Sequence, residues 1–165
     1  MNNLSVCFKV VRYPRKDSEM RQNSELRWSV FAGLKYEVAY LPGRNTGPMV
    51  KGSKLYAFET QREAVRFAEG CRQATSDFME VWLAMAENAK WSEWVSYLPF
   101  CRTYYAKEFD YFWNLVKAGN RSMSNYRVAE PPPRTVECEA LILVTLLERF
   151  EGIKEPDLIF RSVSA

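Results

Sequence analysis

Four polar residues have the side chains that a group-transfer enzyme would need. Arg12 follows the apolar stretch 6–11, Ser29 lies within a second apolar stretch, and Glu137 and Glu139 stand two positions apart in a third. A fixed carboxylate can stabilise a sugar cation with oxocarbenium character, and a guanidinium can bind two phosphate oxygens at once. This chemistry requires all four side chains in one cleft, so it depends on how the fold brings three distant stretches together.

The same four residues resemble the arginine, serine and Glu-x-Glu pattern of ADP-ribosyltransferases. The resemblance implies that Arg12 would hold the phosphates of a nicotinamide dinucleotide and that Glu139 would stabilise the ribosyl cation. Glutamates at alternate positions of a strand are also the commonest way for a strand to face water, and short motifs often arise by chance. The transferase is therefore the alternative, and we lean towards a protein that is not an enzyme and uses no cofactor.

A second group of residues is suited to binding another protein. Trp91, Trp94 and Tyr97 lie three positions apart, which predicts one helical turn with an aromatic ridge, and Arg102 and Tyr104 follow. Trp, Tyr and Arg are enriched among the residues that dominate binding at protein interfaces. Aromatic and basic side chains can also stack on bases, but acidic residues interrupt this run, so nucleic acid is a second, less favoured alternative. The simplest competing interpretation is that these rings pack in the core.

Composition excludes several classes of site. The 165 residues include no histidine, which removes Ser-His-Asp and Cys-His catalysis and histidine metal sites together. The four cysteines form no Cys-x-x-Cys pair, so we expect buried free thiols and no metal cluster. The longest apolar run is too short to cross a bilayer, and no leader pattern opens the chain. We therefore expect a cytoplasmic protein that does not contact a membrane.

Alternating apolar residues predict the strands that must position these sites. Strands are expected over 6–11, 26–33, 36–40, 55–58 and 135–147. The stretch 78–87 is apolar on too many sides to decide between strand and helix, and we favour a strand. The loop 43–47 is rich in glycine but matches no phosphate-binding motif, so we interpret it as a turn.

Two stretches have helical spacing. Thr60 and Glu63 form a capping box before a stripe of Ala64, Phe67 and Ala68, which can lie on a sheet. A second helix is expected over 103–119. The chain is accordingly predicted to be a single α+β domain, 1–165, in which a mostly antiparallel sheet packs against two main helices. The aromatic helical insertion spans about 88–134.

Three stretches taken in order resemble small uncharacterised α+β proteins encoded by phages and environmental bacteria. They are YEVAYLPG at 36–43, the strand and capped helix at 54–68, and TVECEALIL at 135–143. The resemblance covers about half of the chain and implies no activity. Combined with the aromatic insertion, it leads us to expect a small intracellular module that binds a host or phage protein and modulates or inhibits it.

Overall fold

The computed structural model describes residues 3–13, 25–30, 37–49, 51–72, 77–92, 95–96, 128–129 and 132–152. These residues form eleven strands and one helix, α1 (Gln61–Arg72). The strands are β1 (Leu4–Tyr13), β2 (Arg27–Trp28), β3 (Ala39–Tyr40), β4 (Asn45–Thr46), β5 (Leu55–Phe58), β6 (Phe78–Glu87), β7 (Lys90–Trp91), β8 (Val95–Ser96), β9 (Val128–Ala129), β10 (Thr135–Cys138) and β11 (Ala140–Phe150).

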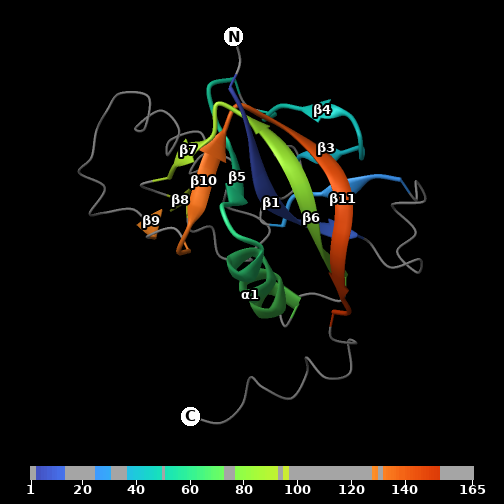
Figure 1. Ribbon diagram of the computed structural model, residues 1–165. Coiled ribbons are helices and arrows are strands. Elements are labelled where there is room, and N and C mark those ends of the chain that lie inside the picture. Colours follow the sequence, from blue (N-terminus) through green and yellow to red (C-terminus); the bar gives the residue numbers. More distant parts are fainter. Residues whose placement is uncertain are drawn as a thin grey trace.

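Nine of the strands form one sheet in the order β4-β11-β6-β1-β5-β10-β7, and β2 joins β1 and carries β3. The long strands β11, β6 and β1 lie side by side, and α1 covers one end of this group (Figure 1). Strands β8 and β9 form a separate pair. Both margins of the large sheet carry very short strands, β4 beside β11 and β7 beside β10.

The two longest strand pairings of the sheet lie on the two sides of β6. β1 and β6 pair antiparallel over their whole length, from Leu4 opposite Glu87 to Tyr13 opposite Phe78. β11 also pairs antiparallel with β6, but two β-bulges shift its register between Leu143 and Phe150. A bulge inserts an extra residue and increases the local twist of a strand. The two bulges therefore add local twist to β11.

Helix α1 begins as its sequence predicts. The Thr60 hydroxyl accepts a hydrogen bond from the backbone N–H of Glu63 at 3.4 Å, which satisfies one unpaired donor of the first turn. Ala64, Ala68 and Cys71 are buried against the sheet, at the spacing expected of one helical face. The Glu63 carboxylate accepts hydrogen bonds from Arg62 and Arg66 on the helix itself. Half of the predicted capping box, the Thr60 cap, is thus confirmed.

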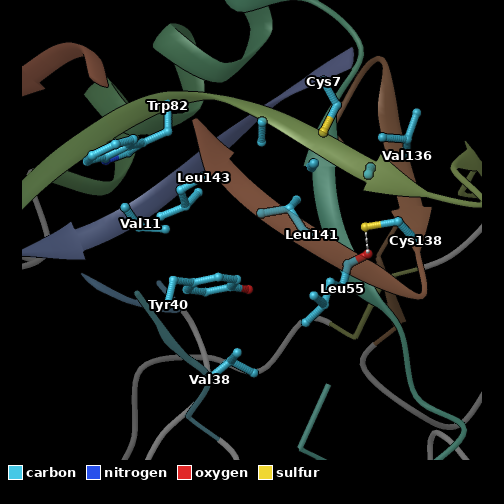
Figure 2. Close-up of a cluster of buried hydrophobic side chains, with 13 residues drawn as sticks. Cys7, Val11, Val38, Tyr40, Leu55, Trp82, Val136, Cys138, Leu141 and Leu143 are labelled. Carbon is cyan, nitrogen blue, oxygen red and sulfur yellow. Dashed lines mark hydrogen bonds between the residues drawn. The ribbon is translucent and has the colours of Figure 1, made fainter. Parts of the chain in front are cut away.

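The opposite face of the sheet has its own apolar core. Val38 and Tyr40, from the segment that contains β3, lie over side chains of the long strands, including Val11, Leu141 and Leu143 (Figure 2). Cys7 and Cys138 belong to the same cluster and are buried, as expected of free thiols in this chain. The described helix is too short and too polar to cross a membrane.

The predicted fold class is wrong in its balance of elements. The described residues are mostly antiparallel sheet with a single helix, whereas we expected an α+β domain with two main helices. The second expected helix, 103–119, lies outside the described residues. Strand residues outnumber helical residues because β6 and β11 extend over ten and eleven residues and bury apolar side chains on both faces of the sheet.

Two further expectations need correction. The helical turn through Trp91 is wrong: Trp91 lies in β7 and pairs with Val136 of β10, and Val95–Ser96 forms β8. Spacing of three residues suits a helix, but backbone pairing with a neighbouring strand overrides this weak local preference. The single strand expected over 135–147 is two strands, because the chain turns a corner at Glu139. The strands predicted around β1, β5 and β6 are confirmed.

Candidate functional site

Trp91 is the one predicted interface residue that the structure describes. It lies in β7, the last strand at one margin of the large sheet, and 55% of it is exposed. Pairing with Val136 fixes the backbone beneath it, and the N–H of Ser92 donates to the carbonyl of Thr135 at 3.1 Å. A large ring is therefore held on a fixed backbone and open to solvent.

A charged side chain lies over the Trp91 ring and is itself paired with a carboxylate. The guanidinium carbon of Arg134 lies 5.4 Å from the ring centroid, a cation–π arrangement. Arg134 also donates from Nη1 to Glu59 at 2.8 Å, whereas Lys90 points to the opposite face of β7 and pairs there with Glu137 at 3.1 Å. We call Glu59, Trp91 and Arg134 the Trp91 surface. An exposed aromatic ring bordered by charges of both signs is typical of a protein-binding surface.

Arg134 has a backbone conformation that few side chains adopt. Its φ is 63°, in the left-handed region that is sparsely populated by residues other than glycine. It lies in the turn that leads into β10, where the Thr135 N–H donates to the carbonyl of Pro132 at 3.2 Å. The turn directs the guanidinium over the Trp91 ring. The other predicted interface residues, Trp94, Tyr97, Arg102 and Tyr104, lie outside the described residues.

The structure brings Arg12 and Ser29 together, but it uses both of them structurally. Arg12 Nε donates to the carbonyl oxygen of Ser29 at 3.2 Å, Nη1 binds Asp77 at 3.0 Å, and Nη2 binds Glu37. The Ser29 hydroxyl accepts a hydrogen bond from the N–H of Val38 at 3.1 Å. Arg12 thus already has two carboxylate partners, and a dinucleotide phosphate would have to displace them.

Glu137 and Glu139 are also occupied. Glu139 accepts hydrogen bonds from Lys54 Nζ and Asn88 Nδ2, each at 2.8 Å, and both lower the pKa of its carboxyl, Lys54 more strongly. Glu137 pairs with Lys90 on the neighbouring strand. Glu139 lies at the corner between β10 and β11, so these contacts hold the corner in place.

Register separates the two halves of the transferase pattern. Arg12 is opposite Met79 on β6, whereas the N–H of Glu139 donates to the carbonyl of Glu87 on the same strand. Eight residues of extended strand between Met79 and Glu87 correspond to ~26 Å, at about 3.3 Å per residue. Arg12 and Glu139 therefore lie at opposite ends of the sheet, which does not favour a shared active site.

The described cysteines have the properties of core residues. Burial raises the pKa of Cys7 and of Cys71 to about 12 and that of Cys138 to about 11. A thiol is nucleophilic only as the thiolate, so these three groups are unreactive near neutral pH. Across the described ranges, no three cysteine or acidic side chains gather as a metal site would require. The turn expected at 43–47 is confirmed only at its start, where Gly43 has a φ of 76°, because Asn45–Thr46 forms β4 and pairs with β11.

The sequence did not lead us to predict a buried ionic cluster around Glu80, at the end of the sheet where Arg12 lies. Glu80 is fully buried and accepts hydrogen bonds from Arg27 Nε at 2.6 Å, Arg149 Nη2 at 2.6 Å and the Trp82 indole N–H at 2.8 Å. The guanidinium carbons of Arg27 and Arg149 lie 4.3 and 5.2 Å from the centre of the Tyr13 ring. The cluster joins β1, β2, β6 and β11. Alternation in 78–87, which places Glu80 on the face of Trp82, was the available signal.

Lys9 is a second buried charge that the sequence did not reveal. It is 8% exposed, donates a hydrogen bond to the carbonyl of Tyr56, and lies 5.3 Å from the centre of the Tyr40 ring. Burial lowers its pKa to about 8, partly offset by the neighbouring Cys138 and Cys7. The Tyr40 hydroxyl is buried and has no hydrogen-bond partner among the described groups. Polar groups therefore lie inside the core that Figure 2 shows.

Other large apolar side chains are exposed on the sheet besides Trp91. Val144 and Leu146 of β11 are 50% and 37% exposed, at the margin opposite β7. Leu4 and Val6 are exposed on β1, and Met49 in the loop before β5. Both margins of the sheet thus present apolar side chains to solvent.

The chain was compared with protein-family models, curated proteins and solved structures, and none of the three comparisons found a match.

Proposed function

We propose that this protein is a small intracellular module that binds another protein through the Trp91 surface and thereby modulates or inhibits a protein of the host cell. The observation that carries the proposal is the exposed Trp91 ring on the margin strand β7, with Arg134 over it. The resemblance of three stretches to phage-encoded proteins supports a host partner. Trp94, Tyr97, Arg102 and Tyr104 follow Trp91 in the chain and are proposed to extend the same contact.

Trp91 exposes a large apolar ring to water, and a partner that covers it removes this surface from solvent. A Trp side chain that is more than half exposed contributes little to folding, yet its burial by a partner removes apolar surface from water at about 25 cal/mol per Å². Its two side-chain torsions lose little entropy on binding, and Arg134 already restricts the ring. Rigid aromatic residues next to arginine are typical of the few residues that dominate binding energy.

Affinity capture from a host lysate tests the proposal. Tagged protein should retain a specific protein partner after nuclease treatment, and Trp91→Ala should lose it while the thermal midpoint changes little. Met49→Ala is the matched control, because Met49 is also apolar and exposed but lies in the loop between β4 and β5 and is not part of the Trp91 surface. This variant should retain the partner.

Three results would contradict the proposal. A large fall in thermal midpoint for Trp91→Ala would show that the ring supports the fold. Equal capture by Trp91→Ala and the unmodified protein would remove the Trp91 surface from the interface. Loss of the captured material on nuclease treatment would favour nucleic acid as the partner.

A further inference from the structure

We propose that Lys9 and Tyr40 form a buried binding site for a small monovalent anion, with chloride as its ligand. The anion accepts one hydrogen bond from the Lys9 ammonium group and one from the Tyr40 hydroxyl. This site lies in the apolar core on the face of the sheet opposite α1. It does not depend on the Trp91 surface, and it gives a role to polar groups that the proposed protein-binding function does not use.

Lys9 points into this core with a charge that no described side chain neutralises. Cys7 and Val11, two positions to either side of it on β1, belong to the cluster that Figure 2 shows, so Lys9 faces the same way. Its ammonium group donates one hydrogen bond, to the Tyr56 carbonyl, and none of the described ion pairs includes it. With a pKa of about 8, the side chain still carries its charge at pH 7. Because buried charges in proteins are normally paired, the remaining N–H donors require an acceptor with negative charge.

Tyr40 provides a second unused donor beside Lys9. Its side chain is 1% exposed, and its hydroxyl has no hydrogen-bond partner among the described residues. Lys9 Nζ lies 5.3 Å from the centre of the Tyr40 ring, and Figure 2 shows the hydroxyl directed towards Leu55 of β5. The Lys9 ammonium group binds the carbonyl of the next residue on that strand, so the two donors approach the same part of β5.

Charge and size together select the ligand. A water molecule satisfies the hydroxyl but leaves the ammonium charge uncompensated, and a metal cation is repelled by that charge. One negative charge neutralises the site, whereas a divalent anion such as sulfate leaves a net charge in the core. The surrounding side chains are apolar and buried, and protein interiors contain few voids larger than a water molecule, so the anion must be small. Chloride meets both conditions.

The chloride dependence of stability tests the site in the intact protein at pH 7. The thermal midpoint in sodium chloride should be about 3 °C higher than in sodium gluconate of equal concentration, because a ligand that binds only the folded state stabilises it. Gluconate is the matched salt, since it is monovalent but too large for the core. The difference should saturate as chloride replaces gluconate at constant ionic strength. Broadening of the chloride nuclear magnetic resonance line by the protein reports binding directly.

Protein variants assign the effect to the two donors, and circular dichroism verifies that each variant is folded. Lys9→Met should lose both the chloride-dependent midpoint and the line broadening. Tyr40→Phe should bind chloride about tenfold more weakly, because it removes one hydrogen bond to a charged group. Lys51→Met replaces a lysine that is exposed in a turn, and this control should behave as the unmodified protein does.

Three results would overturn the anion site. Chloride and gluconate would stabilise the unmodified protein equally, Lys9→Met would retain the chloride effect, or Tyr40→Phe would bind chloride as tightly as the unmodified protein. Trp91→Ala should keep the full chloride effect, because Trp91 is not part of the site. The two proposals can therefore fail separately: none of these results changes the capture of a protein partner, and loss of that capture leaves the chloride measurements unchanged.

Discussion

Replacing Lys9 by Met should stabilise this protein near neutral pH. Lys9 is almost fully buried, and its ammonium group has a hydrogen bond to the Tyr56 carbonyl but no carboxylate partner among the described ion pairs. Burial lowers its pKa from 10.5 to about 8. Met has a similar length and no charge, so the variant keeps the packing between the sheet and Tyr40 while removing the cost of burying a charge.

The size of the effect follows from the pKa values. Each pH unit of difference corresponds to about 1.4 kcal/mol, so the change from 10.5 to about 8 corresponds to about 3 kcal/mol of lost stability at pH 7. Losing the hydrogen bond to Tyr56 costs about 1 kcal/mol. We therefore expect Lys9→Met to raise the free energy of unfolding by about 2 kcal/mol at pH 7.

The sign of the pH dependence provides an independent check. Between about pH 8 and 10.5 the folded protein has a neutral Lys9 while the unfolded chain still binds the proton, so the contribution of Lys9 to stability increases with pH. The raised pKa values of the buried Cys and Tyr residues act in the opposite direction. Lys9 lowers the pKa values of Cys7 and Cys138, so its replacement raises these two further and reduces the advantage of the variant at high pH in the same sense. The advantage of the variant should therefore disappear as pH rises through this range.

Urea unfolding of the two proteins at pH 7 and at pH 10.5 measures both quantities. Lys51→Met is the control, because Lys51 is exposed in a turn and its replacement should change stability by less than about 0.5 kcal/mol. If Lys9→Met destabilises the protein at pH 7, or if the difference between the proteins does not depend on pH, Lys9 is not the buried, weakly compensated charge described above.

Two other substitutions test the packing of the sheet by urea unfolding. Glu80→Gln removes the carboxylate that binds Arg27 and Arg149 and should lower the free energy of unfolding by about 3 to 5 kcal/mol. Glu69→Gln, on the exposed side of α1, should lower it by less than about 0.5 kcal/mol. Equal effects would show that the cluster around Glu80 is not important for stability. Phe67→Ala should lower the free energy of unfolding by about 2 kcal/mol, less than the about 3 to 5 kcal/mol typical of a fully buried ring, because Phe67 is only half-buried. Its ring centroid lies 5.1 Å from that of Phe58. A near-neutral result would mean that the packing of α1 does not depend on this contact.

Local patterns in the sequence were sufficient to predict α1, several strands and the burial of some side chains. Thr60 is one residue before α1 and accepts the predicted capping bond, because a cap involves only neighbouring residues. The strands β1 and β5 follow from alternation of apolar residues, which depends only on the geometry of an extended chain. The stretch of β6 has no clear alternation, and its strand was only favoured over a helix. The buried positions of Cys71 and Cys138 follow from the same periodicities.

Other features depended on which strands become neighbours. Trp91 lies in a strand because residues of β10 pair with it, and the corner at Glu139 exists because β10 and β11 pair with different strands. The local sequence contains neither piece of information. The share of helix was overestimated for a related reason: the extended pairing of β6 and β11 dominates the described fold.

The sequence alone determined the residue types that could do chemistry and, through the absence of histidine, several that could not. Only the tertiary structure decided which of them meet. Arg12 lies with Ser29 and Glu37 but far from Glu139, and Glu80 lies between two arginines from β2 and β11. The physical reason is register: a strand places each side chain on one face at one height, but its position relative to other strands is set by pairing between residues far apart in the chain.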